Sequence, residues 1–200
     1  YYRTTDEMLT AFAYLGAAKA REIVIDRPRA IADLIEDGIK PFPDGTYPPT
    51  IESAADELSD LTWTRAMKDY GHQGVLPAIV KDRVEKELKA IIGNGFAIMY
   101  YIAYQLVKKS NDDGYLVGSR GSVGSSLVAY LCGISEVNPL PPHYYCPACA
   151  YFDVAQQGDY GSGYDLPKMS CPLCQATLCS DGQHIPFETF LGFYGDKQPD

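Results

Sequence analysis

Histidine and basic charge are both scarce in this sequence, and each shortage restricts the chemistry. The 200 residues include three scattered histidines, from which no serine–histidine–acid arrangement can be argued. Lysine and arginine number 17 against 26 aspartates and glutamates, a net charge of −9. A small autonomous nucleic-acid-binding protein is usually basic, so the charge counts modestly against that class. It does not exclude an active-site domain whose carboxylates hold metal ions.

Long apolar runs and a secretory signal are also missing. The richest apolar run, residues 96–107, is shorter than the roughly 18–20 residues that span a bilayer. The first residues, YYRTTDEML, lack a basic region followed by an apolar one, and they lack an initiator Met. We therefore expect a segment of a longer protein. Apolar residues make up 46%, enough for one packed domain or for one domain with a small appended module.

Helix signals dominate the first part of the chain. Thr4 and Glu7 fit a capping box, which predicts a helix through about residues 19–21. A second helix is expected after Pro28 and stops at Gly38. Its apolar residues are expected to face inward: Ile31, Leu34 and Ile35.

Three further helices are expected after a proline-rich linker over residues 41–51. The first covers 52–70 and stops at Gly71, and the second begins at Pro77. The third, 96–109, is almost wholly apolar and is expected to be buried. The second has apolar residues at helical spacing: Ile79, Val80, Val84, Leu88, Ile91 and Ile92.

A glycine- and serine-rich stretch, GYLVGSRGSVGSSLVAY, separates a short apolar strand expected at 115–117 from a helix expected at 127–131. Glycine lets a backbone approach a ligand, and a helix N-terminus presents unpaired N–H groups with partial positive charge. Together these features favour phosphate binding. The candidate residues are Gly118, Ser119, Arg120, Gly121, Ser122, Gly124 and Ser125. The stretch matches neither a Walker A loop nor a GxGxxG fingerprint, and an ordinary helix-capping turn is the alternative.

Two CPxC pairs, Cys146–Cys149 and Cys171–Cys174, are separated by 21 residues. Two close thiolate pairs on tight turns make a tetrahedral site of the kind that Zn²⁺ prefers. The segment between them suits a short β-hairpin. A redox CxxC motif and disulfides in a secreted chain are the alternatives.

The two other cysteines are weaker candidates. Cys132 follows the Gly/Ser stretch in an apolar helix and is expected to be a small core residue. Cys179 could compete as a ligand, but Cys174 is better spaced relative to Cys171.

The histidines and the final aspartates carry little signal by themselves. His143 and His184 flank the cysteine pairs, but a site made wholly of thiolates needs neither. His72 is interpreted as a surface or capping residue. Asp196 and Asp200 lie in the final residues GFYGDKQPD, which in most proteins would be a tail without a metal.

Five runs of the sequence resemble, in order, the catalytic chain of replicative bacterial DNA polymerase III of the PolC type. The similarity covers nearly the whole chain, and the CPxC pairs within it are typical of the PolC type. The runs are YYRTTDEMLTAFAYLG, LPAIVKDRVEKELKAIIGNGFAIMYYIAYQLVKKS, DDGYLVGSRGSVGSSLVAYLCGISEVNPLPPHYYCPAC, GSGYDLPKMSCPLC and GQHIPFETFLGFYGDKQPD.

This resemblance implies an α+β fold. A helical N-terminal half is followed by part of a palm of the polymerase-beta-like nucleotidyltransferase class, with an inserted four-cysteine zinc module. The implied divisions are 1–40, the C-terminal helices of a PHP-type domain; 41–51, the linker; 52–143, the first part of the palm with the phosphate loop; 144–182, the zinc-binding insertion; and 183–200, a palm strand leading to the catalytic aspartates.

The resemblance also implies the catalytic parts. Asp200 matches the first carboxylate of the family motif Pro-Asp-x-Asp, whose aspartates hold two catalytic Mg²⁺ ions. The second carboxylate would lie two residues further on and the third well downstream, so the 200 residues alone are expected to be inactive. The Gly/Ser loop would lie beside the nucleotide triphosphate, with Arg120 neutralising its charge, and would share a pocket with Asp200.

The implied substrates are primer–template DNA and dNTP, in the bacterial cytoplasm at the nucleoid. Contacts with the sliding clamp and other replisome proteins would come from regions outside these residues. Two alternatives stay open: a non-catalytic zinc-ribbon scaffold module, and another nucleotidyltransferase of the same palm class.

Overall fold

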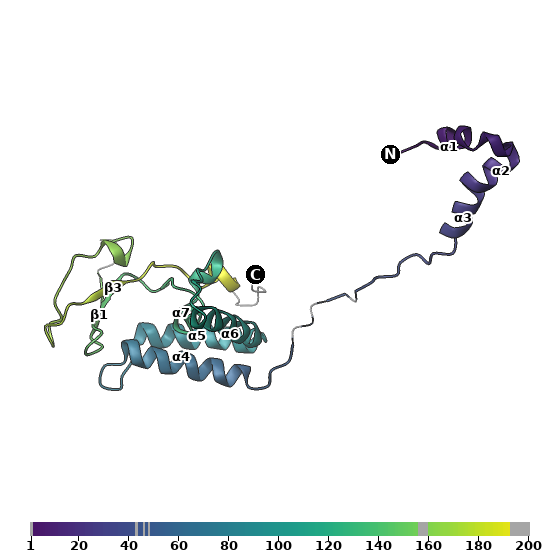
Figure 1. Cartoon of the computed structure of the whole chain (residues 1–200). Coiled ribbons are helices and arrows are strands. Elements are labelled where there is room, and N and C mark those ends of the chain that lie inside the picture. Colours follow the sequence, from purple (N-terminus) through teal and green to yellow (C-terminus); the bar gives the residue numbers. More distant parts are fainter. Residues whose placement is uncertain (1, 43, 46, 48, 156–159, 193–200) are drawn as a thin grey trace. The chain divides into compact units, whose positions relative to one another are not determined.

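The computed structural model describes residues 2–42, 44–45, 47, 49–155 and 160–192. The chain divides into two compact units, Tyr1–Tyr47 and Pro48–Asp200, each of which is described by itself (Figure 1).

The first unit is a series of short helical segments. These are α1 (Thr5–Ala11), the 3-10 turn η1 (Ala13–Leu15), α2 (Ala17–Arg21), the π-helical turn η2 (Glu22–Asp26) and α3 (Arg27–Ala32). The expected capping box is confirmed: Glu7 N donates to Thr4 Oγ1, and Thr4 N donates to Glu7 Oε2. A single helix through residues 19–21 is wrong, because Gly16 has a φ of 86° and interrupts it.

The expected burial of the second helix is also wrong. Ile31, Leu34 and Ile35 are 64%, 81% and 70% exposed. Among the described residues of this unit only Ala20 is buried, so the short helices do not enclose a core for α3 to cover.

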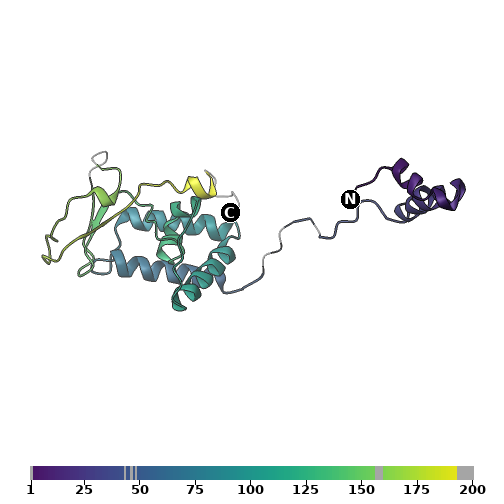
Figure 2. The ribbon, with the colours of Figure 1, turned by 45° about the horizontal axis from the view of Figure 1, so that its top comes forward.

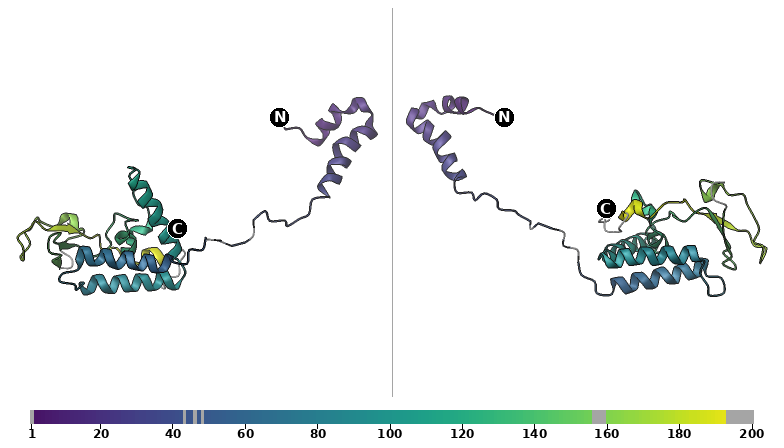
Figure 3. Two further views of the ribbon diagram at one scale, coloured as in Figure 1. Left: turned by 60° about the horizontal axis from the view of Figure 1, so that its bottom comes forward. Right: turned by 180° about the vertical axis from the view of Figure 1, so that it is seen from behind.

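The second unit is built on three longer helices, α4 (Ala54–Tyr70), α5 (Ala78–Gly93) and α6 (Ala97–Asp112). α4 and α5 run side by side, and α6 crosses them (Figures 2 and 3). The shorter elements are the 3-10 turn η3 (Ser122–Ser125), α7 (Leu127–Leu131), the 3-10 turn η4 (Gly163–Asp165) and α8 (Glu188–Leu191). α7 and α8 complete the core with Leu127, Val128, Phe190 and Leu191.

Helix boundaries in this unit follow the sequence closely. α4 ends at Gly71 and α5 begins after Pro77, as expected. The apolar face of α5 is buried at Val80, Val84, Leu88 and Ile91, which confirms its spacing.

The expected burial of α6 is wrong for most of its length. Only Ala97 and Tyr100 are buried, and Leu106 is 67% exposed, because one face of the helix packs against α4. No single helix among the described residues has the length and hydropathy to span a membrane. α5 and α6 meet that test only as a pair bent by 108°.

A small antiparallel sheet has the order β2-β1-β3. Its strands are β1 (His143–Tyr145), β2 (Phe152–Val154) and β3 (Cys179–Asp181). At the centre, Tyr144 is paired with Asp153 on one side and Ser180 on the other. No hairpin lies between the two cysteine pairs among the described residues of that segment, 150–155 and 160–170. The β1–β2 hairpin instead encloses the first pair, because the CPxC turn reverses the chain there.

Two expected strands do not form among the described residues. Residues 115–117 form no strand, and Leu116 is 100% exposed, because no described strand pairs with them. The described part of 183–200 contains α8, and residues 193–200 lie outside the described part of the chain. The α+β class is confirmed: the described part of the chain is a helical fold with one small antiparallel sheet.

Candidate functional site

The structure separates the Gly/Ser loop into an exposed and a buried part. Gly118, Arg120 and Gly121 are exposed, and Ser119 and Ser122 are half-buried. Gly124 and Ser125 are buried, and Ser125 Oγ donates to the Ser122 carbonyl at 2.8 Å. A ligand could therefore reach donors over residues 118–122, while 124–125 shape the turn beneath them.

Ser119 already binds an oxyanion within the chain. Its N–H donates to Glu136 Oε2 at 3.0 Å, and its hydroxyl donates to the same oxygen at 2.9 Å. The Ser119 N–H is also the main reason that the pKa of Glu136 is lowered from its ordinary value. The loop thus presents two converging donors, which could also form hydrogen bonds to a phosphate oxygen.

The N-terminus of α7 differs from the expected open end. Its helix cap is Ser126, whose Oγ accepts from Ala129 N at 3.1 Å. The buried carboxylate of Glu87 on α5 accepts from Leu127 N and Val128 N, both at 3.0 Å. The amides that were expected to bind phosphate at this helix end are therefore occupied by the Glu87 side chain. Glu87 and Leu127 are 40 positions apart in the sequence, so the sequence pattern could not reveal this contact.

The four cysteines of the CPxC pairs converge. Their sulfurs all lie within 4.8 Å of one another, with Cys146 and Cys174 at 3.4 Å and Cys149 and Cys171 at 3.6 Å. A tetrahedron with Zn–S bonds of about 2.3 Å has sulfurs about 3.8 Å apart. The cluster fits a structural metal such as zinc, and Cys132 and Cys179 do not belong to it.

Both knuckles have the same backbone geometry. Ala150 N donates to the Cys146 carbonyl at 2.8 Å, and Gln175 N donates to the Cys171 carbonyl at 3.0 Å. The donors, Ala150 and Gln175, have left-handed φ values of 54° and 61°. Burial raises the pKa of the Cys146 thiol, but backbone N–H groups in its own knuckle outweigh this and lower it to about 7. Those donors stabilise the thiolate, which is the form that binds metal.

His72 has a role that the sequence interpretation missed. Its Nδ1 donates to the carbonyl of Cys149 at 2.6 Å, so the loop between α4 and α5 is bonded to the first knuckle. His72 is half-buried, and this long-range contact adds to the interpretation as a surface or capping residue. Nothing in the local sequence pairs two residues that are 77 positions apart.

His143 joins the sheet to the helical core. Its ring packs against Tyr70 and Phe152, with centroids 5.8 and 4.9 Å away. Nδ1 donates to the Pro141 carbonyl at 2.8 Å, while the buried Nε2 has no hydrogen-bond partner among the described residues. Burial lowers the pKa of His143 from its ordinary value of 6.5.

Acid is expected to destabilise this junction through His143. The unfolded chain takes up the proton near pH 6.5 and the folded chain only at lower pH, so stability is complete above about pH 6.5 and falls below it. His143→Phe keeps an apolar ring and removes the titration. Thermal unfolding between pH 7.5 and 5.5 should therefore show a smaller loss in the variant. An equal loss in both proteins would contradict the assignment.

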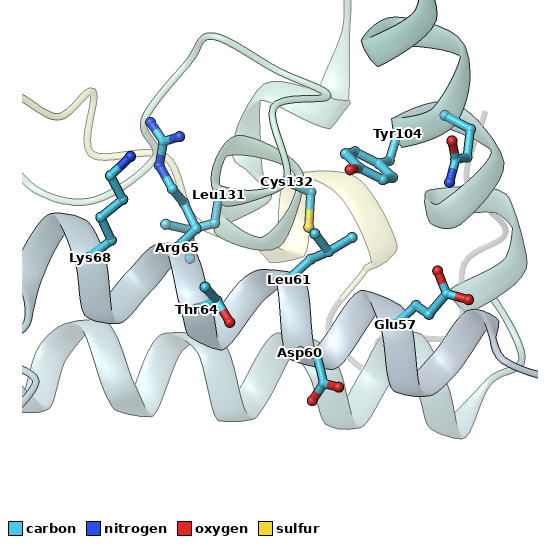
Figure 4. Close-up of a pocket in the computed structure, with 10 residues that line it drawn as sticks. Glu57, Asp60, Leu61, Thr64, Arg65, Lys68, Tyr104, Leu131 and Cys132 are labelled. Atoms are coloured by element: carbon cyan, nitrogen blue, oxygen red, sulfur yellow. The ribbon is translucent and has the colours of Figure 1, made fainter.

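Two hollows lie near these features. One of about 540 Å³ is bordered by α4, α6 and α7 and carries charges of both signs, including Glu57, Asp60 and Lys68 (Figure 4). None of its lining residues belongs to the Gly/Ser loop. A second hollow of about 310 Å³ is lined by Gly118 and Ser119 together with apolar residues of α6 and α8. The loop therefore borders the second hollow and not the first.

Comparisons with known proteins give a consistent result. The model of a family described as bacterial DNA polymerase III alpha NTPase domain matches residues 56–200. The chain is 57% identical over 200 residues to the protein named DNA polymerase III PolC-type of Bacillus subtilis (strain 168), and 56% identical to the one of Caldanaerobacter subterraneus subsp. tengcongensis. The protein of that name in Staphylococcus aureus (strain Mu3) is 57% identical. Each similarity covers the whole chain but only 14% of the relative's length.

Proposed function

Because the chain belongs to the bacterial DNA polymerase III family, in its PolC type, we propose that it is part of a replicative DNA-directed DNA polymerase. The complete enzyme would transfer dNMP from dNTP to a primer 3′-hydroxyl on a DNA template. These 200 residues would supply part of the nucleotide site and would be inactive alone.

The observation that carries this proposal is the pair of donors on Ser119. They hold the Glu136 carboxylate at 2.9–3.0 Å, which supports an affinity of this loop for oxyanions. In the polymerase, the β- and γ-phosphates of dNTP would take the place of that carboxylate. Arg120 is exposed at the same turn and would neutralise their charge, and Gly121, at a φ of 97°, provides the turn that presents the donors.

Catalysis would require metal ions held by carboxylates. We assign Asp200 to the first of these, as a ligand of Mg²⁺, and place the others outside this chain. Two Mg²⁺ ions would activate the primer hydroxyl and stabilise the pyrophosphate leaving group. Asp200 lies outside the described residues, so its shared pocket with Ser122 stays a prediction.

The remaining parts would serve this site. Residues 1–40 would close a PHP-type domain, 41–51 would be the linker, and 52–143 with 183–200 would belong to the palm. Residues 144–182 would form a zinc module that braces the chain between the loop helix and the final segment. We propose primer–template DNA and dNTP as substrates, clamp and replisome contacts elsewhere in the protein, and a cytoplasmic, nucleoid-associated location.

Substitutions in the exposed part of the loop test the proposal. In a full-length polymerase that carries these residues, Arg120→Ala and Ser122→Ala are each expected to raise the KM for dNTP by about tenfold, since each removes a partner of the phosphates. Steady-state incorporation on a primed template measures this. Arg29→Ala, at an exposed arginine of the first unit, is the matched control.

An unchanged KM in both loop variants would contradict the nucleotide-binding role. The loop would then be a helix-capping turn, and the scaffold alternative would be favoured. A third outcome has two parts: the full-length protein shows no templated synthesis, and the loop variants raise the KM for a small nucleotidyl acceptor. That outcome would favour the other nucleotidyltransferase.

A further inference from the structure

Glu87 is a fully buried carboxylate that the proposed function does not use. Its side chain is 0% exposed, and it lies on α5 within hydrogen-bonding distance of the start of α7. The helices α5 and α7 lie next to each other (Figure 1). Besides the amides of Leu127 and Val128, it accepts from Ser126 Oγ at 2.8 Å and from Arg83 Nε at 2.5 Å. Burial raises the pKa of Glu87, and Arg83 and the two amides oppose that rise.

The chemistry of this position requires a carboxylate. All four partners donate, and only an ionised carboxylate offers two oxygens that accept without donating. A buried charge is tolerated where it is paired and fully hydrogen-bonded, as here. An apolar residue at this position would leave the α7 amides without their partner.

Arg83 extends the same contact to two other segments. A second nitrogen of its guanidinium, Nη2, donates to the Ser125 carbonyl at 2.6 Å and to the Ile185 carbonyl at 3.1 Å. Ser125 ends the Gly/Ser loop, and Ile185 lies in the segment that leads towards Asp200 in the sequence. One ion pair on α5 therefore joins the loop, the start of α7 and the segment 183–187.

We propose that Glu87, together with Arg83, is a positioning residue for nucleotide binding, an inference that rests on the function proposed above for the Gly/Ser loop. The pair would hold the end of the loop at Ser125 and Ser126. In that way it would set where the donors of Ser119 and Ser122 meet the phosphates. Neither Glu87 nor Arg83 would touch the nucleotide.

Glu87→Gln in a full-length polymerase tests this. The amide keeps one acceptor but directs a donor at groups that are themselves donors, so the end of the loop loses its fixed position. We expect the KM for dNTP to rise by about tenfold, and the inhibition constant of inorganic pyrophosphate to rise in parallel. Pyrophosphate is used because it presents phosphoryl groups without base or sugar. The Kd for primer–template DNA should not change.

Two further variants complete the design. Arg83→Lys keeps a positive charge beside Glu87 but cannot bridge both carbonyls in the same way, and a rise in KM of about threefold is expected. Glu85→Gln, on the same helix but exposed, is the matched control and should leave every constant unchanged. Should Glu87→Gln fail to fold, Arg83→Lys decides the question.

The outcomes distinguish a role of Glu87 and Arg83 in positioning the Gly/Ser loop from a role in folding stability alone. The inference would be overturned if active-site titration showed a loss of active enzyme while the folded variants kept an unchanged KM for dNTP and an unchanged inhibition constant for pyrophosphate. If Arg120→Ala and Ser122→Ala raise the KM while Glu87→Gln and Arg83→Lys do not, the inference fails and the proposed function stands. If the loop variants have no effect, the proposed function itself fails.

Discussion

Replacing Cys171 with serine is expected to abolish the binding of one zinc ion per chain and to unfold the three-stranded sheet. Cys171 is 0% exposed and its sulfur lies 3.6 Å from that of Cys149, so it is a buried member of the cluster. A serine hydroxyl is not a zinc ligand of this type, and structural zinc contributes about 10–16 kcal/mol of apparent binding free energy in small domains. The loss of one of the four ligands should therefore greatly weaken zinc binding and destabilise the sheet.

Zinc content of the purified 200-residue chain, measured under reducing conditions, checks this prediction together with circular dichroism. Cys179→Ser is the matched control: Cys179 lies in β3 but outside the cluster, and its substitution should retain the metal. One zinc ion per chain retained in Cys171→Ser, or none bound by the unsubstituted chain, would contradict a thiolate site.

Gly182→Ala is expected to lower the free energy of unfolding by about 2–5 kcal/mol, because both the backbone angle and the space exclude a side chain. Gly182 has a φ of 105°, and a Cβ there would lie 2.3 Å from the Pro141 carbonyl oxygen. The close approach lets residues 183–185 run beside 138–140, where Gln183 N donates to the Asn138 carbonyl at 2.9 Å. That contact brings Ile185 to Arg83.

Denaturant unfolding in the presence of zinc measures this effect apart from metal loss. Gly161→Ala is the control, since a Cβ at that position meets nothing within 4 Å and the residue is exposed. Equal stability of the two variants would show that the contact between 182 and 141 is not closely packed.

Local features were the ones that could be predicted from the sequence. The capping box at Thr4, the stop of α4 at Gly71 and the buried face of α5 each depend on neighbours within one or two helical turns. The four-cysteine cluster was also predictable, because the CPxC turn brings each pair of sulfurs together and two matched pairs make four.

Errors arose where a residue's environment depends on distant parts of the chain. Residues 115–117 have strand-like composition but no described partner strand, and α6 has an apolar sequence but only one covered face. The composition of a segment shows which of its side chains could be buried. Whether they are buried depends on the elements that pack against the segment.

By itself, the sequence determined the family, the helices α4 to α7 and the four cysteines that cluster, because these follow from motifs and short-range spacing. Only the tertiary structure decided which amides of the Gly/Ser loop are open. Glu87 occupies the α7 amides from 40 positions away, and Glu136 occupies Ser119 from 17. It likewise decided that His72 bonds to the first knuckle. Such pairs are set by tertiary packing, and hydrogen bonds between residues far apart in the sequence leave no periodic pattern in it.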